Sequence, residues 1–124
     1  HGLSLAKALG SKVTIITATD PFPGSGGWLT ANMYLEQYEI DTKKHVDNML
    51  SAVKMAADKM GLEVDTLHVI NAWPAAAIID AAKSKGCNLI VMSSHGRRGV
   101  RRILLGSQAA EVVSSSPIPV LVVR

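Results

Sequence analysis

Strand-like runs and longer helical segments alternate along the sequence, and this alternation limits the possible folds most strongly. The strand-like runs are rich in apolar and β-branched residues and lie at positions 12–19, 63–70, 88–92 and 119–123. Between them, apolar residues recur every three or four positions, as on one face of a helix. We therefore expect an α/β fold, a doubly wound parallel sheet with helices on both faces.

The helical segments are bounded by residues that commonly start or end helices. Glycine follows three of them, at positions 10, 61 and 86, where its tolerance of positive φ suits a helix end. Pro74 suits the first position of a helix, and Pro117 follows the end of the last one. These signals predict helices over residues 2–9, about 30–60, 74–85 and 107–115. On the third helix we expect a buried face formed by Ala77, Ile78, Ala81 and Ala82.

The size and composition indicate one soluble globular domain over residues 1–124. A chain of 124 residues can form one hydrophobic core. No apolar run approaches the length of a membrane span, and the sequence begins with no secretory leader, so we expect no membrane partner. The single cysteine, Cys87, excludes an internal disulfide and predicts a cytoplasmic location. We expect its side chain at the edge of the core.

The positive charge of the chain is concentrated in one loop. The net charge is +3, from 13 basic and 10 acidic residues, and four of the basic residues are Arg97, Arg98, Arg101 and Arg102. Without them the balance is nine basic against ten acidic residues. A nucleic-acid-binding protein would spread basic residues over a face and would add aromatic stacking platforms, but this loop contains no aromatic residue. We therefore expect a compact phosphate site and no nucleic-acid partner.

Residues 92–108 have the order of a strand end, a glycine-bearing loop and a helix start. Small residues allow a ligand to approach the backbone, and a helix start offers unpaired N–H groups and the positive end of the helix dipole. Ser107 can cap this helix or donate its hydroxyl to a phosphate oxygen. The loop therefore predicts an anion site, for which the phosphates of a nucleotide are the favoured ligand.

The same stretch resembles the signature of the universal stress protein family. That signature is a glycine, two residues, a second glycine, nine residues, a third glycine, and then serine or threonine. Gly96 takes the second position, residues 97–105 are the nine, and Gly106-Ser107 completes the pattern, whereas Ser93 replaces the first glycine. The flanking runs at 88–92 and 117–123 are also similar to the family, and the likeness extends more loosely over nearly all of the chain.

The resemblance implies an adenine nucleotide alpha hydrolase-like fold and an adenine nucleotide as ligand, ATP or AMP, with the need for Mg²⁺ left open. Family members begin with a strand and a loop whose aspartate contacts the base. Neither precedes the helix at 2–9, so we expect that the first strand is missing from this chain. Carried over by position, the residues implied for nucleotide binding are Ala18, Met92, Ser93, His95, Gly96, Arg97, Gly106, Ser107 and Gln108.

The resemblance implies a role for each of these residues except His95. Met92 and Ser93 would contact the ribose or base through the backbone, and Ala18 would lie beside the base. Gly96 and Arg97 would line the phosphates, whereas Gly106, Ser107 and Gln108 would hold the outer phosphates. The added Cβ and hydroxyl of Ser93 could weaken binding or replace a water molecule, and both readings stay open.

Hydrolysis is harder to support than binding. Phosphoryl transfer uses a metal-binding carboxylate, a lysine on the phosphates and a group that orients water. The loop has no such group, and the nearest acid, Glu111, follows Ser107 by one helical turn. His95 could act as a base, although a backbone or packing role is favoured. We expect no catalytic residue, no metal site and slow turnover at most.

The last strand, Val120–Val123, is apolar at every position. Family members pair their last strands across a dimer, and an apolar edge strand without a partner would promote aggregation. We therefore expect a homodimer, with an interior strand as the other possibility. The implied function is an ATP- or AMP-binding module in stress response or signalling. The alternative is a dimeric interaction protein whose nucleotide site is degenerate, as Ser93 and the missing aspartate would suggest.

Overall fold

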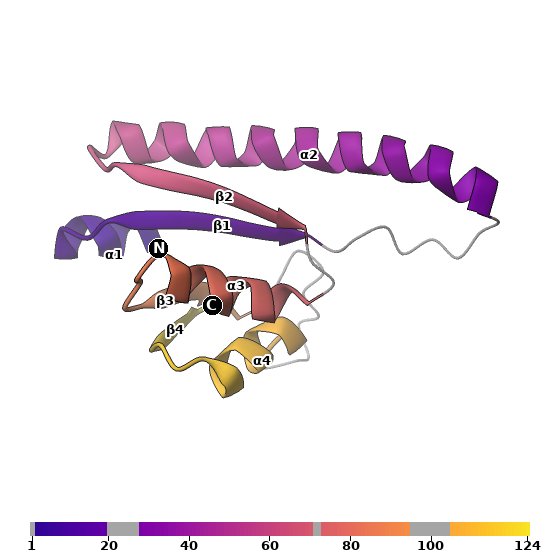
Figure 1. Ribbon diagram of the computed structural model, residues 1–124. Helices are drawn as coiled ribbons and strands as arrows, with labels where there is room; N and C mark the ends of the chain where they lie inside the picture. The colour runs from indigo at the N-terminus through magenta and orange to yellow at the C-terminus, as the bar shows by residue number, and fades with distance from the viewer. Residues whose placement is uncertain (1, 20–27, 71–72, 95–104) are drawn as a thin grey trace. The chain divides into compact units, whose positions relative to one another are not determined.

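The computed structural model describes residues 2–19, 28–70, 73–94 and 105–124, with the side chains of residues 28–35 and 38 excepted. Helices and strands alternate in these ranges, as the sequence predicts (Figure 1). In chain order the elements are α1 (Gly2–Leu9), β1 (Val13–Thr19), α2 (Trp28–Lys59), β2 (Val64–Ile70), α3 (Pro74–Ser84), β3 (Ile90–Ser93), α4 (Ser107–Ser115) and β4 (Val120–Val123).

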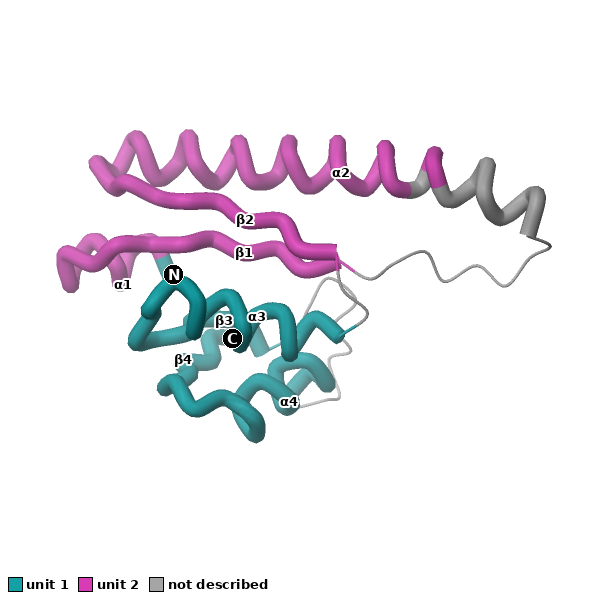
Figure 2. The backbone as a smooth tube through the Cα atoms, viewed as in Figure 1, with its two compact units in different colours: residues 1–2, 73–124 teal, residues 3–72 magenta. Residues whose placement is uncertain are grey.

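The chain forms two compact units, residues 3–72 and residues 1–2 with 73–124 (Figure 2). In the first unit, β1 and β2 pair in parallel from Val13 opposite Val64 onward, and α2 packs against β2. In the second unit, β3 and β4 pair in parallel from Ile90 opposite Val120 onward. There, α4 packs against both α3 and β4. The parallel pairing agrees with the sequence prediction, because parallel strands need a crossover connection, usually a helix.

Three helices end in the same glycine-based motif. Gly10, Gly61 and Gly86 have φ angles of 66°, 74° and 66°, the left-handed conformation that glycine adopts without strain. In each case the next residue donates its backbone N–H to a carbonyl five positions earlier, at 2.9–3.0 Å. This is the hydrogen bond of the Schellman motif, which satisfies a carbonyl that the helix leaves unpaired. The predicted glycine stops are therefore confirmed.

Small residues form much of the core of the second unit. Its buried cluster consists of Ala75, Ile79, Ala82, Ile90 and Val112. Alanine allows the backbones of α3 and α4 to approach closely. Val112, which α4 contributes to this cluster, is 0% exposed. The predicted buried face of α3 is thus partly wrong, because Ile79 is buried and Ile78 is only half-buried. Cys87 packs against the cluster, as expected for a residue at the core edge.

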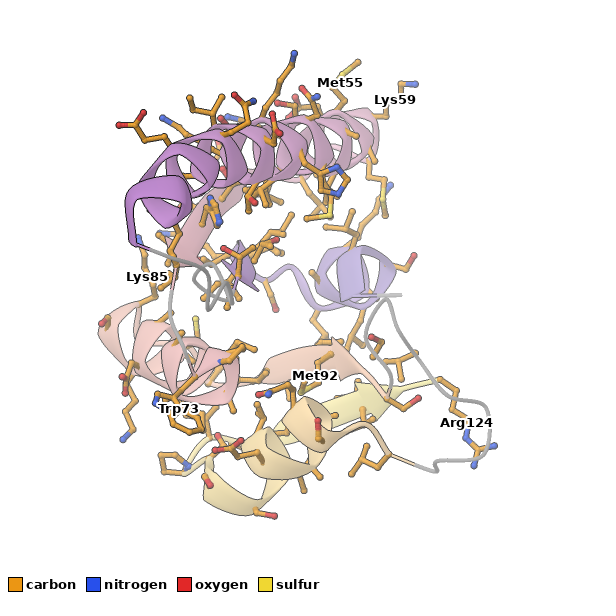
Figure 3. The ribbon with its side chains drawn as sticks, turned by 90° about the vertical axis from the view of Figure 1, so that its right-hand side faces the viewer. Met55, Lys59, Trp73, Lys85, Met92 and Arg124 are labelled. Atoms are coloured by element: carbon orange, nitrogen blue, oxygen red, sulfur yellow. The ribbon has the colours of Figure 1, made fainter. Side chains whose placement is uncertain are left out.

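The first unit buries one face of α2. Val46, Leu50 and Ala57 are buried and are spaced as on one side of a helix. Met55 and Lys59 lie on the side of α2 that faces away from the strands (Figure 3), and Met55 is 63% exposed. Every residue of β1 is half-buried.

A side-chain hydrogen bond joins the two strands of the first unit near the carboxyl end of β1. The hydroxyl oxygen of Thr19 and Nε2 of His68 lie 2.9 Å apart, in a partly buried position. Thr19 and His68 share one face of the sheet, because Thr17 is directly opposite His68 in the parallel register. The bond therefore connects β1 to β2 in addition to the backbone ladder.

We predict that Thr19→Val lowers the free energy of unfolding by about 0.5–1.5 kcal/mol, the usual net contribution of one such hydrogen bond. Urea denaturation followed by circular dichroism measures the change. Thr14→Val, on the opposite face of the same strand, is the matched control and should cost less. Equal effects of the two substitutions would contradict a stabilising role for the bond.

Candidate functional site

The strand that leads into the candidate site is shorter at its start than predicted. β3 spans Ile90–Ser93, so the predicted range of 88–92 is wrong at both ends. The ladder begins where the N–H of Ile90 donates to the carbonyl oxygen of Pro119 at 2.9 Å. In this register the carbonyl of Asn88 would need an N–H from position 119, and proline has none. The strand consequently begins at Ile90, and it ends at Ser93.

Ser94 joins the end of β3 to the start of α4. Its N–H donates to the carbonyl oxygen of Val123 at 2.8 Å, which completes the ladder with β4. Its own carbonyl oxygen accepts the N–H of Gly106 at 2.6 Å. Ser94 is 5% exposed. These bonds hold together the two ends of the segment that the sequence singled out as a phosphate loop. We call this hydrogen-bonded connection the Ser94–Gly106 closure.

Residues 95–104 of the predicted phosphate loop lie outside the described residues, and six residues discussed above are among them. They include the predicted nucleotide-binding residues His95, Gly96 and Arg97. The other three are the arginines at positions 98, 101 and 102. Their roles stay predictions from the sequence.

Gly106 has a backbone conformation that any amino acid can adopt. It is the N-cap residue of α4, with φ −62° and ψ 154°. Its carbonyl accepts the first helical hydrogen bond, from Ala110 at 2.9 Å, while its N–H is used by Ser94. The remaining donors of the helix start are the N–H groups of Ser107 and the two following residues, which have no partner within a helix. The first turn of α4 carries no acidic residue, so no carboxylate there offsets the positive end of the dipole.

Gln108 connects α4 to α3. Its side-chain Oε1 accepts the backbone N–H of Ala75 at 3.2 Å. Ala75 lies in the first turn of α3, which has Pro74 at its start and no side-chain hydrogen bond from its N-cap residue, Trp73. The sequence predicted a phosphate contact for Gln108 and gave no sign of this bond, because the two residues are 33 positions apart.

The backbone groups of Met92 and Ser93 point to opposite edges of β3, because successive residues of a strand alternate in the direction of their hydrogen bonds. The observed bonds of Ile90 and Ser94 direct the backbone groups of residues 90, 92 and 94 toward β4. The backbone of Ser93 consequently faces the opposite edge of β3. The Met92 side chain packs against the core of the second unit (Figure 3). Of the two residues, Ser93 is the one whose backbone groups do not point toward β4.

A shallow hollow of about 270 Å³ lies at the carboxyl ends of β3 and β4. Met92, Ser93 and Arg124 are among the residues that line it, together with Gly2, Val91 and Val123. Its volume is close to the lower limit for small-molecule sites, about 300 Å³. Arg124 is an exposed cation that the sequence analysis did not single out. The parallel alignment of β4 with β3 places it at this end of the sheet.

Ala18, the remaining predicted site residue, belongs to the other unit. It lies next to the last residue of β1, opposite Val69, and is half-buried. Its expected place beside the base stays a prediction. Within the described ranges, no group of three or more histidine, cysteine, aspartate or glutamate residues could hold a metal ion. The helices of the same ranges include none with the length and apolar character needed to cross a bilayer.

The comparison with known sequences identifies the family. The profile of the universal stress protein family matches residues 1–124, and the chain belongs to this family. Universal stress protein MJ0531 of Methanocaldococcus jannaschii is 33% identical over 129 residues, which cover 100% of this chain and 71% of that protein. Universal stress protein YxiE of Bacillus subtilis is 36% identical over 101 residues, or 77% of this chain and 68% of the relative.

Solved structures share the fold. Universal stress protein UspA from Lactobacillus plantarum superimposes with a TM-score of 0.82 at 20% identity, over 99% of this chain and 84% of its own. A universal stress protein in complex with cAMP gives 0.68 at 22% identity, over 99% and 81%. The universal stress protein from Archaeoglobus fulgidus in complex with dAMP gives 0.64 at 19% identity, over 98% and 81%. The predicted α/β fold with a parallel sheet and flanking helices is thereby confirmed.

We predict that Gly106→Pro lowers the free energy of unfolding relative to Gly106→Ala by about 0.5–1.5 kcal/mol. Both residues tolerate the φ angle of −62°, but only proline removes the N–H that Ser94 accepts. Guanidinium denaturation of the two variants measures the difference. Equal stabilities would show that the Ser94–Gly106 closure contributes nothing to the folded state.

Proposed function

We propose that this chain binds ATP or AMP through the start of α4 and acts as a dimeric module in stress response or signalling. The observation that carries the proposal is the Ser94–Gly106 closure, in which the carbonyl of Ser94 accepts the N–H of Gly106 at 2.6 Å. It fixes the carboxyl end of β3 beside the N-terminus of α4. Ligands of open parallel α/β sheets bind at such strand ends.

The chemistry of this helix start suits phosphate oxygens. The N–H groups of Ser107 and Gln108 lie in the first helical turn, where the helix dipole is equivalent to roughly half a positive charge. The Ser107 side chain is exposed, and its hydroxyl is available to donate to a phosphate. The four arginines of the preceding segment supply positive charge in the sequence immediately before this turn. A triphosphate, with its greater negative charge, would gain more from them than a monophosphate.

The ligands of related structures support an adenine nucleotide. Two universal stress proteins of the same fold have been solved with cAMP and with dAMP. Both ligands combine adenine with a single phosphate, so they support the base and the first phosphate of the proposed ligand. ATP, and any Mg²⁺ that accompanies it, is the further step that we propose here. Since no described residue is assigned to phosphoryl transfer, we propose binding with slow turnover at most.

We predict that Ser107→Asp lowers ATP affinity at least tenfold, because a carboxylate at the helix start repels the phosphates. Ser115→Asp is the matched control, since it adds the same charge at the other end of α4. An acidic residue in the first turn favours the helix itself, so lost binding in Ser107→Asp would not reflect unfolding. Isothermal titration with ATP, AMP and adenosine measures the three affinities.

Two outcomes of this titration would contradict the proposal. Equal weakening of ATP binding by the two substitutions would place the phosphates away from the start of α4. No heat with the wild-type chain at millimolar nucleotide would exclude nucleotide binding. That second result would favour the dimeric interaction protein with a degenerate site, for which the serine at position 93 is the supporting observation.

We also propose that the outer edge of β4 pairs with β4 of a second copy. Leu121 in this strand is 41% exposed. The ladder with β3 uses the backbone of residues 119, 121 and 123, so the N–H groups of Val120 and Val122 point away from β3. No strand among the described residues pairs with this edge, and such a row of donors and acceptors is a template for pairing with another strand.

We predict that Val122→Pro weakens dimerisation at least tenfold, because proline removes an N–H from the outer edge while leaving the bonds to β3 in place. Val122→Ala is the matched control, since it shortens the side chain and keeps the N–H. Sedimentation equilibrium measures the dimer constant, and circular dichroism checks that both variants fold. The same dimer constant for both variants, or a monomeric wild type, would contradict dimerisation through this edge.

A further inference from the structure

The first turn of α3 receives its cap from another helix. The N–H of Ala75 is one of the helix-start donors that have no partner within α3, and its N-cap residue makes no side-chain hydrogen bond to it. Oε1 of Gln108 accepts this N–H at 3.2 Å. A side chain in the first turn of α4 therefore accepts a hydrogen bond that the side chain of an N-cap residue usually accepts within its own helix.

The packing around Ala75 places this bond at the contact between α3 and α4. Ala75 is 1% exposed and belongs to the buried cluster of the second unit, together with Val112 of α4. Gln108 and Val112 are four residues apart, so they lie on the same side of α4. The bond is partly buried and Gln108 itself is exposed, so if the side chain turned away the N–H of Ala75 would lose its acceptor from α4. The first turns of α3 and α4 are therefore held together by packing and by this hydrogen bond.

We propose that Gln108 acts through its side chain as a positioning residue of the nucleotide site, and that this side chain is not a ligand of the outer phosphates. By capping α3 through Ala75, it fixes the place of the first turn of α4, whose N–H groups take the phosphates under the proposed function. The inference rests on that function for its binding part. The hydrogen bond to α3 can be tested without any nucleotide.

The two roles of Gln108 make opposite predictions for the Ala75 amide. A positioning residue keeps its bond to Ala75 when ATP binds, so hydrogen exchange of that amide stays slow or becomes slower. A direct ligand would leave Ala75 to reach the phosphates, and exchange of the amide would become faster. The exchange rate of one backbone amide, measured by NMR with and without ATP, therefore separates the two roles.

The experiment compares the wild-type chain with Gln108→Met, Gln108→Glu and Ser114→Met. Methionine has a similar length but no comparable acceptor, and glutamate keeps an acceptor for the Ala75 N–H. Ser114→Met introduces the same side chain at another exposed position of α4 as a control. Amide exchange is measured for all four proteins. Affinities for ATP and for adenosine are measured by titration for the wild type and the two methionine variants.

We expect Gln108→Met to accelerate exchange of the Ala75 amide about five- to tenfold, the loss expected for one hydrogen bond, and Gln108→Glu to restore slow exchange. ATP affinity should fall about fivefold or more in Gln108→Met while adenosine affinity is unchanged, because only the phosphates depend on the placement of α4. Ser114→Met should match the wild type in both measurements.

Each other outcome overturns a defined part of the inference. Faster exchange of Ala75 in the wild type on ATP binding would make Gln108 a direct ligand. Faster exchange in Gln108→Met with unchanged ATP affinity would show that Gln108 caps α3 but does not position the nucleotide site. Unchanged exchange of the Ala75 amide in Gln108→Met would show that Gln108 does not cap α3. If the wild type binds no nucleotide, the proposed function and the positioning role both fail, whereas the exchange rates still decide whether Gln108 caps α3.

Discussion

The hydrogen bond from the N–H of Gly106 to the carbonyl of Ser94 is the contact on which the candidate site depends. Ser94 is almost fully buried and is also bonded to Val123, so β3, β4 and α4 meet at one residue. The start of α4 is consequently fixed at the carboxyl end of the sheet. A row of amides that is already held in place binds an anion more tightly, because less ordering is needed when the ligand arrives.

Glycine and proline set the limits of the elements around this contact. Three glycines in the left-handed conformation end α1, α2 and α3 with the same hydrogen bond. Pro119 has no N–H for the carbonyl of Asn88, so the ladder does not extend toward that residue and β3 begins at Ile90. Gly106 differs from the three helix-ending glycines, because its φ of −62° needs no glycine.

Much of the fold could be predicted from local patterns. Helix ends marked by Gly10, Gly61 and Gly86 depend on residues within a few positions of each other, and so does a proline at the start of α3. The buried face of α3 was predicted less well, because apolar residues lie on more than one side of this helix. A face with Ile78 and a face with Ile79 both fit the helical period. Packing against Val112 and Ile90 selects the stripe that contains Ala75 and Ile79. The bond between Thr19 and His68 was likewise not predictable, since it depends on the register of β1 against β2.

The order of amino acids was enough to establish the α/β class, the position of the helix start at Ser107 and the likeness to the universal stress proteins. Those features follow from spacing along the chain and from the conformations that glycine and proline allow. Three-dimensional packing assigned the individual groups: the N–H of Gly106 to Ser94, the backbone of Met92 to β4, and the side chain of Gln108 to Ala75. These partners are distant in sequence, and a hydrogen-bond donor or acceptor carries no local signal of which distant group it will meet.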